Sequence, residues 1–192
     1  MKNPDQIDKD LISNKELNNP IKFKFFEVEN IAGVDYNKLR SQAEYNMMKE
    51  TILKIHSVYP THNILVLARN NDMIHNMFED KELRDEVGTK IKFLKHSDID
   101  IDAMTIHKSK GLTSDEVIVI GLDKRFPSDE HNDFWLKMLF KNKKEIEKIA
   151  YAEERRLFYV ALTRTKNYVF LIANKDSRYR SPFINEIYDI TK

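Results

Sequence analysis

Basic and hydroxyl side chains gather between residues 105 and 113 of this 192-residue chain. His107, Lys108 and Lys110 stand there among hydroxyl residues, and no acidic residue interrupts the stretch. Gly111 adds a position where the backbone can approach a ligand closely or take a positive φ. Positive charge, hydroxyls and free backbone N–H groups are the groups that bind phosphate. The stretch is therefore a candidate phosphate site.

A second interpretation of this stretch is a solvated loop whose lysines balance the acidic residues just before it, Asp98, Asp100 and Asp102. The binding interpretation gains weight from position, because the loop directly follows a predicted buried strand. Ligands of open α/β sheets bind at the carboxyl ends of strands. On these residues alone, both interpretations stay open.

Residues 153–166 contain a second charged cluster on a predicted helix. Leu157, Val160, Ala161 and Arg164 follow one another at i, i+3, i+4 and i+7, so they share one helix face. Arg164 thus ends an apolar stripe, where a charge must pair, reach an edge or meet an anionic ligand. Alternatively, Arg164 stands in the last turn, where the helix dipole favours a cation, and its side chain reaches water.

The elements that position these clusters alternate between strands and helices. Strands are predicted over residues 21–25, 64–68, 90–95, 99–106, 116–122 and 168–173. Helices are predicted over 37–58, 73–86, 132–140 and 145–165, with a short one after Pro182. Several strands are apolar on both faces, as in a parallel sheet covered by helices. The pattern predicts an α/β fold with a mostly parallel sheet over residues 21–192, after a flexible lead-in at 1–20.

Composition narrows the classes of function. The apolar fraction of 41% is enough for a full core, and Lys+Arg at 32 nearly cancel Asp+Glu at 31. A nucleic-acid partner must therefore be met by a local patch, because the net charge gives no general attraction. The absence of cysteine excludes disulfides and thiolate metal sites, and no metal site is predicted. No apolar run approaches the roughly 20 residues of a membrane span, so we expect a cytoplasmic protein without membrane contact.

Glycine spacing gives a sharp negative prediction. The four glycines are Gly33, Gly88, Gly111 and Gly121, and no two of them stand five apart. A P-loop needs the pattern G-x-x-x-x-G-K-[ST] so that backbone N–H groups can wrap the phosphates. The chain therefore lacks a Walker A motif and is not expected to hold ATP by itself.

Together the two clusters resemble the motor motifs of UvrD/Rep-type superfamily 1 DNA helicases. Residues 105–117, beginning TIHKSKGL, look like motif V of that family, and residues 153–166, EERRLFYVALTRTK, look like motif VI. Residues 64–71, ILVLARNN, are similar to the strand and loop that open its second motor domain, and residues 181–186 are similar to the end of the helicase IV-like branch. The resemblance covers about 21–190 and implies a RecA-like three-layer fold, the second of two motor domains.

The resemblance also implies roles for individual residues. Arg164 matches the arginine finger, a catalytic group that reaches the γ-phosphate of ATP held by the first domain. Lys110 and Gly111, with Arg164, match the ATP-binding side. The residues that match the DNA-binding side are Arg69, Asn71, Thr105 and His107, whereas Glu153, Arg155 and Arg156 are expected to brace the motif helix. Thr113 stands where many relatives have a glutamate near the ribose, which puts that contact in doubt.

The same resemblance implies partners and cofactors. ATP and Mg²⁺ would be held mainly by a first RecA-like domain, so we expect a fragment that is inactive in isolation and works on single-stranded DNA. Three alternatives stay open: a helicase-like ATPase that remodels a complex such as RNA polymerase, a helicase component of a nuclease-linked defence system, and a free-standing binding module.

Overall fold

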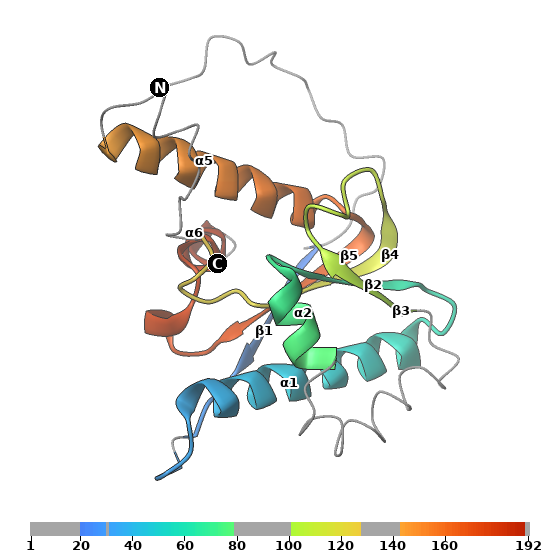
Figure 1. The fold of residues 1–192 in the computed structure, drawn as a ribbon. Helices are drawn as coiled ribbons and strands as arrows, with labels where there is room; N and C mark the ends of the chain where they lie inside the picture. The colour runs from blue at the N-terminus through green and yellow to red at the C-terminus, as the bar shows by residue number, and fades with distance from the viewer. Residues whose placement is uncertain (1–19, 30, 79–100, 128–142, 191–192) are drawn as a thin grey trace.

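The computed structural model of the chain describes residues 20–29, 31–78, 101–127 and 143–190 (Figure 1). Five strands in these ranges form one sheet: β1 (Ile21–Phe26), β2 (Ile64–Ala68), β3 (Ile101–Thr105), β4 (Ser114–Val119) and β5 (Thr165–Asn174). Their order across the sheet is β1-β5-β4-β2-β3, and every pairing between them is parallel. The prediction of a parallel α/β sheet is confirmed.

Helices cover both faces of this sheet. Helix α1 (Tyr36–Val58) lies across one face, and α5 (Lys143–Leu162) lies across the other, where α6 (Pro182–Ile190) also packs (Figure 1). A shorter helix, α2 (Asn71–Phe78), follows β2, and one 3₁₀ turn (Ser177–Tyr179) follows β5. The result is the RecA-like three-layer architecture that the motifs predicted.

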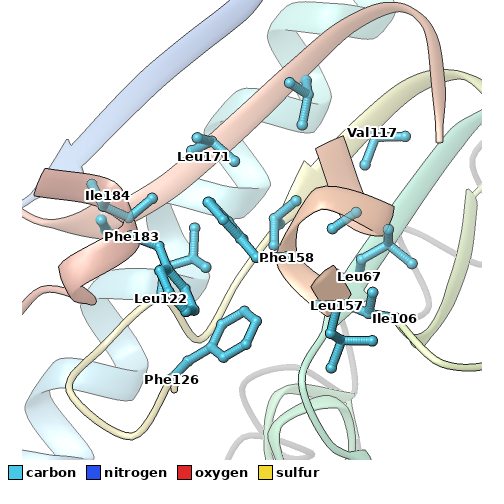
Figure 2. Packing of buried hydrophobic residues seen from close by; sticks show 14 of the residues in the cluster. Leu67, Ile106, Val117, Leu122, Phe126, Leu157, Phe158, Leu171, Phe183 and Ile184 are labelled. Carbon is cyan, nitrogen blue, oxygen red and sulfur yellow. The ribbon is translucent and has the colours of Figure 1, made fainter. Parts of the chain in front are cut away.

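Alternation along the strands divides the apolar side chains into two cores. On β2, Ile64 and Val66 join the core beneath α1, whereas Leu65 and Leu67 join the core beneath α5. All five β2 residues are buried, which explains why the strand is apolar throughout. In the second core, the rings of Phe158 and Phe183 stack at a centroid distance of 5.4 Å beside Phe126 (Figure 2). This aromatic cluster fixes α5 and α6 against the sheet.

Local signals set the ends of α1. The Asp35 carboxylate accepts a hydrogen bond from the Asn37 N–H at 3.0 Å, which caps the first turn. The helix ends at Val58, two residues before Pro60. Because proline restricts the residue before it to extended conformations, the helix cannot continue into Tyr59. The sequence-based prediction of 37–58 is confirmed within one residue.

A buried carboxylate holds α1 to the end of β4. Glu44 is 3% exposed, and its Oε1 accepts the Gly121 N–H at 2.6 Å. Burial raises the pKa of Glu44 to about 7, against the lowering effect of the Gly121 hydrogen bond and of the Arg40 charge. Gly121 has a φ of +72°, and a Cβ at this position would lie 2.3 Å from Sδ of Met73. The positive φ therefore favours glycine here, and a Cβ would also require the Met73 side chain to move.

Several predicted boundaries are wrong, and those next to Arg164 and Ser114 concern the site. The strand expected at 168–173 extends from Thr165 to Asn174. The helix expected to reach residue 165 ends at Leu162, so Arg164 lies in the turn before β5 instead of on the helix. The strand expected at 116–122 begins at Ser114 and ends at Val119. The predicted helix at 73–86 begins earlier, at Asn71. Its continuation beyond residue 78, the strand at 90–95, the helix at 132–140 and the lead-in up to residue 19 lie outside the described residues.

Candidate functional site

The motif V loop, residues 106–113, leaves the carboxyl end of β3 and enters the amino end of β4. Ser109 is fully buried, and its Oγ donates to the Ile106 carbonyl at 2.8 Å. Thr105 is 7% exposed, and its Oγ1 accepts the Lys108 N–H at 3.4 Å. Both hydroxyls thus hold the turn from inside. The loop presents to solvent the basic side chains of His107, Lys108 and Lys110, together with those of Leu112 and Thr113.

Gly111 reverses the loop toward β4. Its φ is +84°, and a Cβ at this position would meet no atom within 4 Å. The space around it is open, in contrast to Gly121, so only the backbone conformation favours glycine here. Ser114 then joins β4, and its N–H donates to the Arg164 carbonyl at 2.9 Å. Motif V and motif VI are therefore bonded to each other through their backbones.

The candidate DNA-binding residues come from two segments that the parallel register brings together. Ala68 is paired with Thr105, and the Ile106 N–H donates to the Ala68 carbonyl at 2.9 Å. Arg69 and Asn71 follow β2 directly, just as Thr105 and His107 stand at the end of β3. The four residues thus lie at the carboxyl ends of neighbouring strands. Asn71 is exposed in the first turn of α2, which the Asn70 side chain caps by accepting the Met73 N–H at 3.1 Å.

Arg69 makes an ion pair that the sequence did not predict. Its Nη2 and Nε contact the carboxylate of Glu154 on α5 at 2.6 and 2.8 Å, a bidentate arrangement. Glu154 is buried, with 8% exposure. A signal existed, because Glu154 stands three residues before Leu157 and so continues the buried stripe of the helix backward. The pair ties the end of β2 to motif VI.

His107 is exposed but carries little positive charge at neutral pH. Partial burial lowers its pKa, and the positive charges of Arg69 and Lys110 lower it further. The imidazole is therefore neutral at pH 7, because its ordinary pKa of 6.5 is already below that pH. His107 can offer a hydrogen bond to nucleic acid, whereas the neighbouring exposed Lys108 supplies positive charge.

The guanidinium of Arg164 bridges the two motifs. Its Nε donates to the Val160 carbonyl at 3.0 Å, at the end of α5. Its Nη1 donates to the Leu112 carbonyl at 3.2 Å, and its Nη2 to Oγ1 of Thr163 at 3.1 Å. Among the described residues, no carboxylate forms an ion pair with it. Arg164 is thus a partly exposed cation, held by neutral oxygens, next to the Gly111 turn.

The DNA-side and nucleotide-side candidates occupy different ends of the sheet. Arg69 and His107 lie at the carboxyl ends of β2 and β3. Arg164 precedes the amino end of β5, where Ser114 pairs with Thr165. The two ends of the sheet are roughly 16 Å apart, which is the length of the five-residue strand β2. The motif V loop spans this length, so Lys110 and Gly111 lie toward Arg164 and Thr105 lies beside Arg69.

Other residues of motif VI make contacts away from the DNA-side and nucleotide-side candidates. Arg155 forms an ion pair with Glu186 of α6 at 3.0 Å, and the Tyr151 hydroxyl bonds to the same carboxylate at 3.1 Å. Arg156 and Glu153 form an exposed pair at 3.5 Å within the helix. These contacts agree with the predicted bracing role. In the described ranges, no cluster of three metal-ligating side chains occurs, and no helix is long and apolar enough to cross a membrane.

The chain thus combines a RecA-like parallel three-layer sheet with two motifs that are joined at the amino ends of β4 and β5. Residues 92–176 match the family model described as the UvrD-like helicase C-terminal domain, which confirms the resemblance. Among curated proteins, the chain is similar to DNA helicase IV of Escherichia coli (strain K12), with 36% identity over 128 residues, which are 65% of this chain and 16% of that protein.

Helicase–nuclease proteins are also similar to the chain. The ATP-dependent helicase/nuclease subunits of Bacillus mycoides (strain KBAB4) and Bacillus cereus (strain B4264) are each 35% identical over 124 residues. The match covers 50% of this chain and 10% of each relative. The chain therefore spans only a small part of the length of the relatives it matches.

Proposed function

We propose that the chain is the second motor domain of an ATP-dependent DNA helicase or translocase, and that it supplies the arginine finger and part of a single-stranded DNA track. The observation that carries this proposal is the environment of Arg164. Its guanidinium is held by the carbonyls of Val160 and Leu112 and has no acidic partner among the described residues. A cation held in this way keeps its charge available for an anionic ligand.

The finger would act on a nucleotide whose phosphates are held by a first RecA-like domain. During hydrolysis, negative charge spreads over the phosphoryl oxygens, and a pre-positioned guanidinium stabilises it. Lys110 and the open backbone at Gly111 are exposed and adjacent in the loop, and they would contact the same ligand. Mg²⁺ would belong to the first domain, in agreement with the absence of a Walker A motif from the sequence.

The DNA track would use the carboxyl ends of β2 and β3. Asn71 and His107 are exposed there and can contact the phosphate backbone by hydrogen bonds. Thr105 would contribute through the turn that it stabilises. Arg69 is partly exposed beside Glu154, so its contact with DNA would depend on that ion pair. Because motif V joins this end to Arg164, movement of the loop would couple the track to the nucleotide.

The test is turnover in the full-length protein with its first motor domain. Arg164→Ala is expected to lower DNA-stimulated ATP hydrolysis by about 10³–10⁵-fold, the range for arginine fingers, while binding of a fluorescent ATP analogue changes little. Arg156→Ala is the matched control, because Arg156 is exposed on α5, the helix that precedes Arg164, and pairs only with Glu153 among the described residues. Normal turnover in the Arg164 variant would refute the finger assignment.

A second candidate function is a helicase component that works with a nuclease. The names of the Bacillus relatives favour it, since they describe helicase/nuclease proteins. Purification of the native protein distinguishes the two candidates: a helicase–nuclease assembly contains a DNA-degrading activity that survives Arg164→Ala when ATP is not required for cleavage. Unwinding without any nuclease activity would favour the first candidate.

A further inference from the structure

A groove with a volume of about 660 Å³ lies at the β1 edge of the sheet, between β1, β5 and the second half of α1. We call it the β1 groove. Its lining includes Lys22 and Lys24 from β1, Lys54 from α1, Tyr59 directly after α1, and Tyr168 and Phe170 from β5. The strand order places β1 at the opposite edge from β3, so the groove lies away from the candidate DNA-binding residues at the carboxyl ends of β2 and β3. No step of the proposed motor mechanism uses it.

The charge of the β1 groove has one sign. Three lysines line it, and no acidic residue does within the described part of the chain. This contrasts with the chain as a whole, where acidic and basic residues nearly cancel. Lys54 is exposed on α1, and Lys22 and Lys24 are half-buried, so all three ammonium groups can meet a ligand. A concentrated positive patch on a nearly neutral chain is complementary to a polyanion.

Aromatic side chains stand between these lysines. Tyr168 and Phe170 are two residues apart on β5, so they project from the same face of the sheet about 7 Å apart. Both are half-buried, as is Tyr59 on the facing wall. The Lys22 ammonium lies 5.3 Å from the centre of the Tyr168 ring, which places a cation directly beside an aromatic face. Aromatic rings on a sheet surface, with lysines beside them, are the groups that stack bases and bind phosphates of single strands.

We propose that the β1 groove binds single-stranded nucleic acid, with bases against Tyr168 and Phe170 and phosphates against Lys22, Lys24 and Lys54. An acidic peptide would also be attracted by the three lysines. The aromatic rings favour nucleic acid, because carboxylates have no use for a stacking surface. The site goes beyond the motor function, since it needs neither ATP nor motif V. It would give the domain a second strand contact at the edge opposite the track.

Binding of fluorescein-labelled oligo(dT) and oligo(rU) to the 192-residue chain tests the groove by anisotropy across a salt series. Replacing Lys22, Lys24 and Lys54 together by glutamine should reduce the slope of log K against log[salt] by about 2, because single strands release about 0.7 counterion per phosphate contact. Tyr168→Leu should weaken binding about tenfold without changing the slope, since one stacked base is lost. Lys148→Gln on α5 is the control for an exposed lysine outside the groove.

Cross-linking locates the strand independently of affinity. An oligonucleotide that carries 5-iodouracil should cross-link to the peptides with Tyr168 or Phe170, and the yield should persist in a Lys108→Gln/Lys110→Gln variant of motif V. Preference for oligo(dT) or oligo(rU) identifies the nucleic acid. Cross-links confined to residues 105–113, or unchanged affinity in the folded triple-lysine variant, would overturn the proposal. Displacement of the oligonucleotide by a poly-glutamate peptide of higher affinity would also overturn it, in favour of a peptide site.

Discussion

Replacing Arg69 by alanine would remove the only guanidinium that contacts the Glu154 carboxylate in the described structure. The two members of this pair differ in burial: their side chains are 25% exposed for Arg69 and 10% for Glu154. After Arg69→Ala the carboxylate stays in a nearly buried position without its counter-charge. After Glu154→Ala the guanidinium can turn toward water. We therefore expect the arginine substitution to be the more harmful one.

The expected loss of stability lies between the values for a fully buried ion pair and for an exposed one. Breaking a buried ion pair by removing one partner costs about 3–5 kcal/mol, whereas an exposed pair contributes about 0–1 kcal/mol. For a bidentate pair with partial exposure, we expect Arg69→Ala to reduce the free energy of unfolding by about 2–3 kcal/mol and Glu154→Ala by about 1–2 kcal/mol. The coupling energy in a double-mutant cycle should be about 1–2 kcal/mol.

Urea denaturation of the wild type, both single variants and the double variant measures these values. The pair of Arg156 with Glu153 provides a control on the same helix, because its side chains are 73% and 67% exposed. Its coupling energy should stay below about 0.5 kcal/mol. A coupling energy for Arg69 with Glu154 that is no larger than in this control would refute the bracing role. A larger cost for Glu154→Ala than for Arg69→Ala would refute the burial argument.

Three further predictions concern single positions. Gly121→Ala should destabilise by roughly 2–3 kcal/mol in urea denaturation, because the positive φ opposes a side chain and the Met73 side chain must move to make room for the methyl group. Gly111→Ala, with open space around it, should cost only about 1 kcal/mol. Equal costs for the two variants would contradict the packing argument. Burial raises the pKa of Glu44 to about 7, so the wild type should lose up to about 3 kcal/mol of stability as pH rises from about 4.5 to 7. Urea denaturation at several pH values should show that Glu44→Gln lacks this pH dependence. The same pH dependence in the wild type and in the variant would count against the role of Glu44. Lys108→Gln, beside His107, should reduce the salt slope of DNA binding by about 0.7. His107→Gln should leave this slope unchanged at pH 8, because the lowered pKa keeps the imidazole neutral.

Local patterns in the sequence were sufficient for most of the fold. The run at 64–68 is apolar on both faces because β2 is paired on both sides and covered by helices on both faces. Asp35 and Pro60 set α1 through contacts within a few residues, so its bounds were predictable. The motifs V and VI were recognisable because their residues are continuous in the chain. The resemblance that these motifs carry did not depend on tertiary contacts.

Only the tertiary structure decided which charged groups meet. Arg69 and Glu154 are 85 residues apart, and no local pattern indicates that their side chains form a bidentate pair. The hydrogen bond from Arg164 to the Leu112 carbonyl spans 52 residues. This hydrogen bond depends on α5 ending at Leu162, whereas the apolar spacing alone predicted a helix that continues to residue 165. The β1 groove joins lysines and aromatic residues from β1, α1 and β5. Periodicity identifies the face of each element, but the parallel register and the packing of α1 place those faces together, because they arise from contacts between segments distant in the chain.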